Sequence, residues 1–454
     1  MPASETRKTP TYLCAAGTVI GFSDGDVDRA TGIRYARADR FRPPLPEPPA
    51  SEPILATTPA PACPQASVPM LDVVLARPMR GMAYDEHCQR LSVTVPAGAG
   101  AGDDLPVMVW IHGGSYTGGA GDAPICDARA MVVEQRVVVV SVTYRLGLFG
   151  FLGSATGRPA NLGLLDLVEA LRWVRRNIAA FGGDPAAVTV FGQSAGGDAI
   201  AHLMVADGAR GLFRRAIIQS PPLGIARGRA RMSEAMNEAA AHLDAETSAD
   251  EVVATQTEVA RRSASFGLAA AMPFGTQYGL PPLPAEDDLD AAWADVAPEV
   301  HVLTGWTRRE VALFAPGNAT LDRLSRVPLL GWAAREVVVA VLTRRVHSGA
   351  IRTFARRHAR AGGRVHRYVI GWGAPHYVYA AAHAIELPLL FGDEETWRGA
   401  TLLEGAHWSE VHRQGRILRA IWADFARTGR ASGSYPGLIR VTDVTQARTA
   451  GKLQ

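Results

Sequence analysis

The seven residues from Phe191 to Gly197, FGQSAGG, contain the pattern G-x-S-x-G with Ser194 at its centre. An apolar run at 187–190 precedes them and a segment with helical periodicity, 198–205, follows. Ser194 is therefore predicted to lie on a sharp turn between a strand and a helix. Such a strained turn holds the hydroxyl where both a base and a carbonyl carbon can reach it. G-x-S-x-G alone occurs by chance, but its flanking strand and helix make Ser194 the predicted nucleophile.

An activated serine also requires a base, a group that orients the base, and hydrogen-bond donors for the oxyanion. The sequence HGGSYTGG, residues 112–119, directly follows the first strongly apolar run. Its glycines expose backbone N–H groups, and its place ahead of the serine's strand suits one half of an oxyanion hole. A plain glycine-rich turn is the alternative. A phosphate-binding loop is excluded, because neither G-K-[ST] nor G-x-G-x-x-G is present.

Six apolar runs, rich in β-branched residues, must position these groups. They cover residues 107–111, 137–142, 187–190, 216–218, 300–303 and 365–370. Nearly continuous apolar strands that alternate with helices indicate an α/β fold, with a large, mostly parallel central sheet and helices on both faces. The clearest helix is predicted from Leu164 to Phe181, where apolar residues recur at steps of three and four and Gly182 and Pro185 mark the end.

We expect a single domain over residues 1–454, with two distinctive segments. Residues 1–60 combine short β-like pieces with a proline-rich stretch at 41–49, which predicts a small N-terminal β region that wraps around the fold. Residues 226–298 are rich in alanine and charged residues. This composition predicts a mostly helical insertion near the active site.

The overall composition is that of a globular enzyme, with 47% hydrophobic and 20% charged residues. A net charge of +3 is too balanced to indicate a nucleic-acid partner. The first ten residues lack the apolar stretch of a secretion signal, and no apolar run is long enough to cross a bilayer. We therefore expect a cytoplasmic location and no membrane partner. Oligomeric state is not predicted.

Further segments match those of a known family. They are residues 32–36 with 40–44, residues 86–93 as a degraded form of the family's Glu-Asp-Cys-Leu segment, and residues 144–147, 161–166, 170–174, 177–185 and 211–220. Together with the serine motif, they resemble the type-B carboxylesterase and cholinesterase family of α/β-hydrolases, in particular its bacterial para-nitrobenzyl-esterase-like members. The resemblance covers nearly the whole chain and is most specific between residues 105 and 220. It implies the α/β-hydrolase fold, a small-molecule ester and water as reactants, and no metal or organic cofactor.

For the base, the order serine, acid, histidine restricts the candidates among twelve histidines to those well after Ser194. His383, within AHAIELPLLFG, resembles the family's histidine loop and follows the last strong apolar run. We expect His383 to be the base. His376 is the nearest competitor, followed by His407 and His412.

For the orienting acid, GWTRRE at 305–310 resembles the family's turn that ends in the catalytic glutamate, which assigns the acid to Glu310. The chain departs from the family at Arg309, where relatives usually carry an acidic residue. A solvated ion pair between Glu310 and its flanking arginines is the alternative. Glu386, three residues after His383, is the fallback acid, although the family uses that position structurally.

The resemblance also implies that the oxyanion donors are the backbone N–H groups of Gly113, Gly114 and Ala195. Ser220 is expected to support the acid, although Pro221 replaces the glycine that usually follows it. The same resemblance matches Cys63 and Cys88 to a pair that relatives join by a disulfide. We expect thiols in a reducing cytosol and a bridge after aerobic purification. The four cysteines are too few and scattered for a zinc site.

The predicted reaction is hydrolysis of carboxylic esters through an acyl-enzyme. A carbamate or amide hydrolase with the same triad is the first alternative, because an acyl-enzyme can form from any of these carbonyls. A non-catalytic adhesion homologue is a remote one, since all triad positions are present and such relatives typically lack the serine.

Four aromatic residues are predicted to line the substrate pocket, each with an ordinary core position as its alternative: Tyr116, Phe149, Trp306 and Phe314. The chain is shorter than its relatives between Glu310 and His383, which predicts an open pocket mouth and a preference for short to medium acyl chains. Insertion 226–298 folding over as a lid would reverse that preference.

Overall fold

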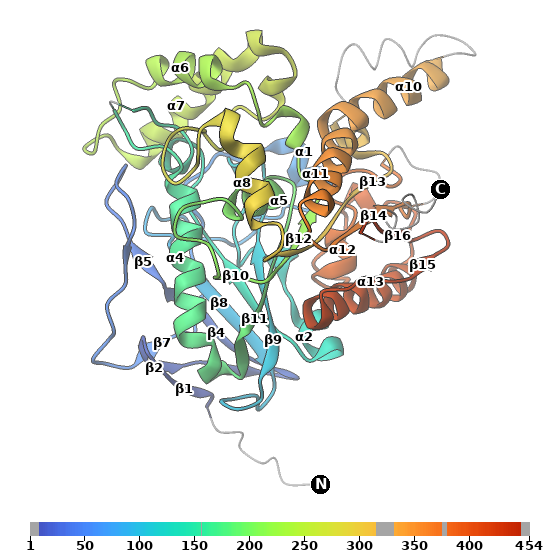
Figure 1. The fold of residues 1–454 in the computed structure, drawn as a ribbon. Helices are drawn as coiled ribbons and strands as arrows, with labels where there is room; N and C mark the ends of the chain where they lie inside the picture. Colours follow the sequence, from blue (N-terminus) through green and yellow to red (C-terminus); the bar gives the residue numbers. More distant parts are fainter. Residues whose placement is uncertain (1–8, 156, 315–330, 375–378, 446–454) are drawn as a thin grey trace.

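The computed structural model describes residues 9–155, 157–314, 331–374 and 379–445, built around a twisted eleven-stranded sheet (Figure 1). From one edge of the sheet to the other, the strands are β15 (Ser434–Tyr435), β16 (Ile439–Asp443), β14 (Val365–Ile370), β13 (His301–Thr307), β12 (Arg215–Gln219), β11 (Gly183–Gln193), β9 (Leu105–Ile111), β10 (Val138–Val142), β8 (Arg90–Pro96), β4 (Val27–Arg34) and β3 (Phe22–Asp24).

The centre of the sheet is parallel. Strands β10, β9, β11, β12, β13 and β14 pair in parallel, and they contain the six predicted apolar runs. Their side chains are almost entirely buried, as expected for strands covered on both faces. Both ends of the sheet are antiparallel, where β8, β4 and β3 extend one edge and β16 and β15 the other. The α/β-hydrolase fold is thereby confirmed, with a mixed rather than uniform sheet.

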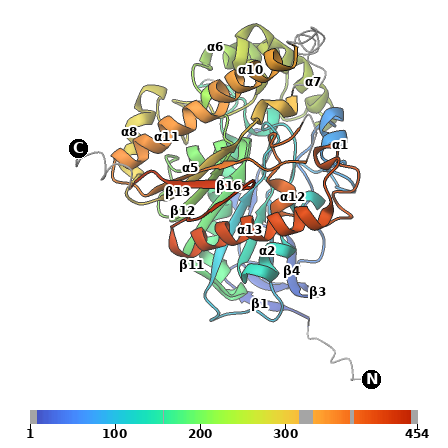
Figure 2. The same cartoon turned by 90° about the vertical axis from the view of Figure 1, so that its right-hand side faces the viewer.

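Helices cover both faces of the sheet, as Figures 1 and 2 show from two directions. One face carries α4 (Leu162–Asn177) and α5 (Ala195–Leu203), and the other carries α2 (Arg129–Gln135), α12 (Leu387–Leu390) and α13 (Trp408–Thr428). Helix α4 continues as a 3₁₀ turn to Phe181, the predicted end, and it begins two residues before the predicted start at Leu164. Gly182 follows with φ +83°, the left-handed conformation that favours glycine at a helix end.

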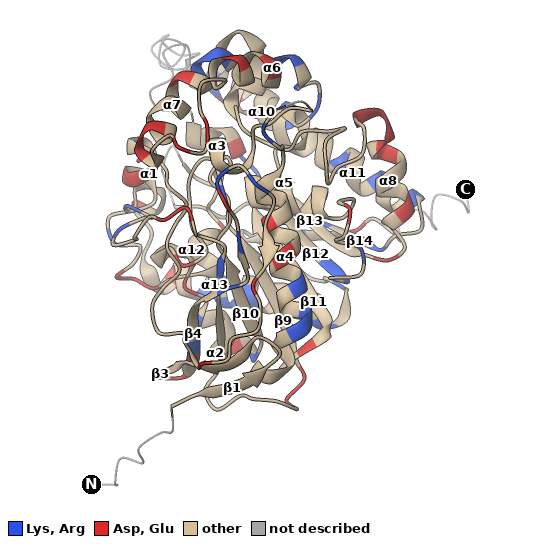
Figure 3. Ribbon diagram, turned by 90° about the vertical axis from the view of Figure 1, so that its left-hand side faces the viewer, with Lys and Arg blue, Asp and Glu red and all other residues tan. Residues whose placement is uncertain are grey.

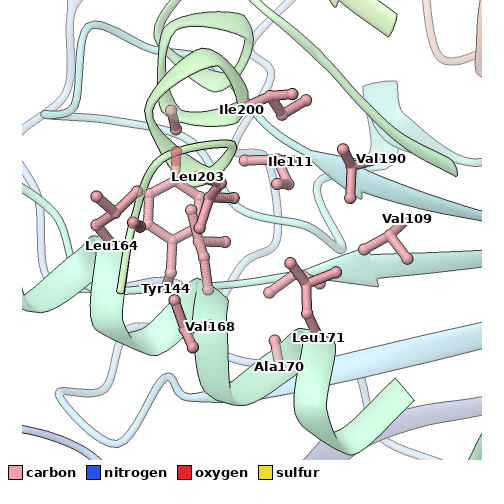
Figure 4. Close-up of a cluster of buried hydrophobic side chains, with 14 of the residues drawn as sticks. Val109, Ile111, Tyr144, Leu164, Val168, Ala170, Leu171, Val190, Ile200 and Leu203 are labelled. Atoms are coloured by element: carbon pink, nitrogen blue, oxygen red, sulfur yellow. The ribbon is translucent and has the colours of Figure 1, made fainter. Parts of the chain in front are cut away.

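The packing beneath the serine turn explains why that turn is held firmly. Leu164, Val168 and Leu171 project from one face of α4 toward Ile200 and Leu203 of α5 (Figure 4). All five are buried. Full burial of a leucine or isoleucine side chain contributes about 1.5–3 kcal/mol to folding. This cluster therefore fixes α5, and with it the turn from which α5 begins.

The N-terminal region forms a small sheet of β1 (Thr11–Cys14), β2 (Gly17–Ile20) and β7 (Ile54–Leu55) beside the main one. The only strand within the proline-rich stretch is β6 (Leu45–Pro46), which pairs with β5 (Ala36–Arg37) just ahead of that stretch. Helix α1 (Pro69–Val74) follows, and a single turn, α3 (Gly147–Gly150), precedes α4.

Residues 226–298 are mainly helical, with α6 (Ala230–Ala239), α7 (Ala249–Arg261) and α8 (Leu289–Val296) above the sheet in Figure 1. Helices α10 (Gly331–Thr343) and α11 (Gly349–Arg360) lie beside them and are joined by a short π-helical stretch, Arg344–Ser348. Charged residues of both signs are scattered over this surface (Figure 3). None of the described helices is long and apolar enough to cross a membrane.

Candidate active site

Ser194 connects β11 to α5 in a strained backbone conformation, with φ +60° and ψ −124°. Two glycines make this turn possible. A Cβ on Gly192 would lie 2.5 Å from the carbonyl oxygen of Ile111, and one on Gly196 would lie 2.1 Å from the same oxygen. Only glycine lets β11 and α5 approach β9 this closely, so G-x-S-x-G here has the geometry of a nucleophile turn.

The glycine-rich loop lies directly against the serine. A Cβ on Gly113 would be 3.1 Å from the Cβ of Ser194, and Gly114 has φ +110°. Within the described residues, the N–H groups of Gly113, Gly114 and Ala195 donate no hydrogen bond. Three unused donors around one hydroxyl are what an oxyanion hole requires. The structure therefore brings the three predicted donors together beside Ser194.

Buried hydrogen bonds hold this loop in place. The His112 ring bonds the Gly113 carbonyl through Nδ1 at 2.8 Å, and the Tyr144 hydroxyl donates to the His112 carbonyl at 2.8 Å. Gln65 bonds both the N–H and the carbonyl of Gly119. Burial lowers the pKa of His112 to about 4, so this imidazole is neutral at pH 7.

His383 and Glu310 form a buried pair. His383 Nδ1 lies 2.5 Å from Glu310 Oε2, while the other carboxylate oxygen accepts the Thr307 N–H at 2.7 Å. Backbone bonds join their loops, since His383 N donates to the Glu310 carbonyl and Arg309 N to that of Ala381. The structure therefore places Glu310, the predicted acid, where it can orient the ring of His383, the predicted base.

The arginines that flank Glu310 do not compete for it. Arg309 forms its ion pair with Glu336, with its Nη2 2.5 Å from the carboxylate. Glu310 itself is fully buried and faces His383 and the Thr307 N–H. This geometry disfavours the solvated ion pair that the sequence left open.

Electrostatics reinforce the pair. Burial favours the neutral form of both groups, but mutual attraction outweighs it: the nearby imidazoles of His347 and His383 lower the pKa of Glu310 to about 2. In turn, the Glu310 carboxylate raises the pKa of His383 above its ordinary value of 6.5. An imidazolium at His383 would thus be stabilised by a fixed negative charge.

Glu386, the fallback acid, lies in the same buried network in a different role. Its Oε1 accepts the Ser220 hydroxyl at 3.2 Å, while Oε2 has no hydrogen-bond partner among the described residues. Burial and the neighbouring Glu310 raise the pKa of Glu386 to about 7. A carboxyl group that is partly protonated at neutral pH is poorly suited to stabilising an imidazolium, so the geometry favours Glu310 as the acid.

Gln193 and His347 belong to the site but were not predicted from the sequence. Gln193 Nε2 lies 3.0 Å from His383 Nε2, so the lone pair of the base is occupied by an amide donor, and Ser194 must displace this donor before it can transfer its proton. His347 is also buried, and its ring centroid lies 5.3 Å from that of His383. Gln193 adjoins the motif in sequence, whereas an isolated histidine such as His347 gives no pattern that could have identified it.

Glu310, His347 and His383 are also the one set of metal-ligating side chains found close together in the described residues, with ligand atoms within 4.8 Å of one another. The Glu310–His383 hydrogen bond occupies two of these groups, and His347 Nδ1 faces the Ser220 carbonyl oxygen at 3.1 Å. The arrangement therefore suits proton transfer better than metal binding.

The pocket in front of Ser194 has a volume of about 420 Å³. Ser194, His383 and the glycine loop line it, and its other lining residues are largely apolar. They include Trp110 of β9, Ile125, Cys126, Leu313 and Leu387, and, from the segment around α1, Met70, Leu71, Leu75 and Met79.

Of the four predicted wall residues, Phe314 lines the pocket. It is 45% exposed, and its ring centroid lies 5.7 Å from that of His383. The other three lie outside the described lining. Tyr116 is buried and donates to Asp198 at 2.7 Å, Phe149 is buried near Phe41 and Arg145, and the Trp306 ring packs against Arg352 and Arg367.

The competing histidines and the two matched cysteines lie away from the acid–base pair or outside the described residues. His407 and His412 are exposed near the start of α13 and do not line the pocket at Ser194, and His376 lies outside the described residues. Cys63 and Cys88 are neighbouring buried thiols, not joined in this structure. Burial, together with Cys63, raises the pKa of Cys88 well above its ordinary value, which makes it a poor nucleophile.

The parallel sheet, the nucleophile turn and the ordered acid and base together define an α/β-hydrolase of the serine type. The Carboxylesterase family model matches residues 6–325. A probable N-octanoylanthranilate hydrolase of Rhodococcus erythropolis is 38% identical over 431 residues, covering 93% of this chain and 94% of the relative. The para-nitrobenzyl esterase of Bacillus subtilis is 34% identical over 454 residues, with 92% and 89% covered.

Solved structures agree with the sequence comparisons. A thermophilic para-nitrobenzyl esterase superimposes with a TM-score of 0.78 at 27% identity, covering 98% of this chain and all of the other. A Geobacillus stearothermophilus carboxylesterase gives 0.73 at 26% identity, with the same coverage. The chain therefore belongs to the Carboxylesterase family, and it is a carboxylic ester hydrolase.

Replacing Glu310 with glutamine is expected to lower kcat by about 10³–10⁴-fold with little change in KM. The amide keeps the shape but removes the charge that orients and stabilises the His383 imidazolium. Steady-state kinetics on one ester would measure both constants. Glu386→Gln is the matched control, with a loss below tenfold. If Glu386→Gln proved the more damaging change, the acid would have to be reassigned to Glu386.

The pH dependence follows from the raised pKa of His383. Only the neutral imidazole accepts the Ser194 proton, so kcat/KM should rise with pH and reach half its maximum above ~6.5, the unperturbed value. In Glu310→Gln the residual rate should have its midpoint at a lower pH, because the stabilising carboxylate is absent. A pH–rate profile that is flat from pH 5 to 8 would contradict a histidine base.

Proposed function

We propose that this protein hydrolyses carboxylic esters through an acyl-enzyme on Ser194, with His383 as general base and acid and Glu310 as its orienting carboxylate. The observation that carries this proposal is the 2.5 Å Glu310–His383 bond in one pocket with Ser194 and three free backbone donors. Glu386 and other histidines were alternatives for the acid and the base, but no other serine, histidine and carboxylate among the described residues lie together in this way.

In the first step, the Ser194 hydroxyl replaces the Gln193 amide at His383 Nε2 and attacks the ester carbonyl carbon. His383 takes the serine proton, and the carbonyl oxygen becomes an oxyanion that accepts the N–H groups of Gly113, Gly114 and Ala195. His383 then donates its proton to the leaving alcohol as the carbon–oxygen bond breaks. Water repeats the sequence on the acyl-enzyme and releases the acid.

The pocket supports acyl groups of medium length. A cavity of about 420 Å³ with apolar walls is within the range that encloses a drug-sized ligand. The name of the Rhodococcus relative specifies an octanoyl substrate. None of residues 226–298 lines this pocket in the described structure, which supports an open mouth rather than one covered by that insertion.

The test is a series of 4-nitrophenyl esters from acetyl to palmitoyl. We expect kcat/KM to peak between four and eight carbons, with a pre-steady-state burst of nitrophenol equal to the enzyme concentration where deacylation is slower than acylation. Octanoyl anilide, matched in chain length, should react more slowly because aniline is a poorer leaving group. A maximum at palmitoyl would contradict the proposed pocket, and anilide exceeding ester would make the chain an amidase.

A further inference from the structure

The charged side chains of the substrate pocket come from one short segment. In the part of the chain that the structure describes, Asp72, Arg77 and Arg80 line the pocket, and all three belong to α1 or the turn that follows it. The remaining walls and base are apolar or uncharged apart from the catalytic His383 and the buried His112. The charged side chains that a substrate meets in the pocket therefore all come from α1 and the turn that follows it.

The net charge of this segment is positive. The Asp72 carboxylate already accepts the Ser67 hydroxyl at 2.6 Å. Arg77 and Arg80 are exposed, and neither guanidinium has a hydrogen-bond or ion-pair partner among the described residues. Some exposed arginines elsewhere in the chain also have no such partner, but Arg77 and Arg80 are the arginines that line this pocket among the described residues. Two guanidinium groups are thus available at the pocket for an anion.

The turn after α1 keeps these arginines at the pocket. Ala76 and Arg77 both have left-handed φ values, +55° and +54°, which are uncommon for residues other than glycine. The Arg77 N–H closes the turn on the Asp72 carbonyl at 2.7 Å. Val74 and Leu75 of the same segment are buried in the core. The backbone that carries the guanidinium groups is therefore fixed.

We propose that Arg77 and Arg80 bind an anionic group of the substrate, so that the pocket selects esters whose alcohol portion carries a carboxylate. The acyl chain lies along the apolar walls, the scissile carbonyl at Ser194, and the carboxylate at the guanidinium groups, which match carboxylate geometry in a bidentate manner. This proposal rests on the proposed ester hydrolysis at Ser194 and names its substrate class.

Two esters of nearly equal shape test it: 4-(octanoyloxy)benzoate, which is anionic, and 4-(octanoyloxy)benzamide, which is neutral. For the unaltered protein, kcat/KM should favour the benzoate, mainly through KM, and the preference should fall as salt rises. In the double variant Arg77→Gln/Arg80→Gln, kcat/KM for the benzoate should fall about tenfold while that for the benzamide changes less than twofold. The ratio of kcat/KM for the benzoate to kcat/KM for the benzamide is compared between the unaltered protein and the variant, which cancels the difference in leaving-group reactivity.

The matched control is Arg176→Gln/Arg231→Gln, which removes the same charge from two exposed arginines that do not line the pocket. This control variant should leave kcat/KM unchanged for both the benzoate and the benzamide. Arg77→Glu/Arg80→Glu should reverse the preference in favour of the benzamide. Equal losses on both esters, or an equal loss in the control, would overturn the assignment to Arg77 and Arg80. Turnover of neither ester by the unaltered protein would instead overturn the proposed function itself.

Discussion

Replacing Ser194 with alanine is expected to lower kcat for a 4-nitrophenyl ester by about 10⁶-fold. The substitution removes the atom that forms the acyl-enzyme, and only the oxyanion donors and substrate binding remain to accelerate attack by water. The variant should fold normally, because the strained conformation at Ser194, with φ +60°, is held by Gly192, Gly196 and the buried face of α5 rather than by the hydroxyl. Initial rates over a long assay, together with circular dichroism, would measure both effects.

Labelling provides the control for this result. An organophosphate should add its mass to Ser194 of the unaltered protein and to no site in the alanine variant, whereas Ser51→Ala, which changes an exposed serine, should retain both activity and labelling. Near-normal turnover by Ser194→Ala, or a label on another serine, would refute the proposed nucleophile.

His383→Ala should be about as damaging as loss of the serine, because the two residues act as a unit. Without the imidazole, no group takes the proton from Ser194 and returns it to the leaving alcohol. The double variant Ser194→Ala/His383→Ala should be no slower than either single variant. This non-additivity is measurable as kcat for one ester across the four proteins.

His407→Ala and His412→Ala, which change exposed histidines on or beside α13, are the matched controls and should retain near-normal rates. His376→Ala should also be mild. If His376→Ala abolished activity while His383→Ala did not, the base would have to be reassigned to His376. Additive losses in the double variant would mean that Ser194 and His383 act independently.

Much of the fold could be predicted because its signals are local. The six central strands are largely buried on both faces, so each appears in the sequence as a mainly apolar run, although β14 includes His366 and Arg367. Ser194 was predictable for a similar reason, since the turn needs glycine at fixed positions around it. The short antiparallel edge strands, such as β15 and β3, were not predicted, because exposed or half-exposed strands of two or three residues have little periodicity.

The pocket was harder to predict. Tyr116, Phe149 and Trp306 were expected to face substrate, yet each is buried against another part of the chain. An aromatic residue near a catalytic loop looks the same in sequence whether its ring fills the core or lines a cavity. The apolar wall around α1 was missed because it lies more than a hundred residues from Ser194 along the chain. Long-range contacts of this kind have no local pattern.

The backbone bonds between the Glu310 and His383 loops have a mechanical consequence. They hold the acid and base to each other independently of Ser194, which lies on a separate turn between β11 and α5, with its N–H donating to the Gln219 carbonyl at 2.9 Å. Because the two turns are separate, a substitution in either one can change the Ser194–His383 separation while the 2.5 Å acid–base bond is kept. Such a variant would lose activity although its acid–base pair and its nucleophile turn each keep their own geometry.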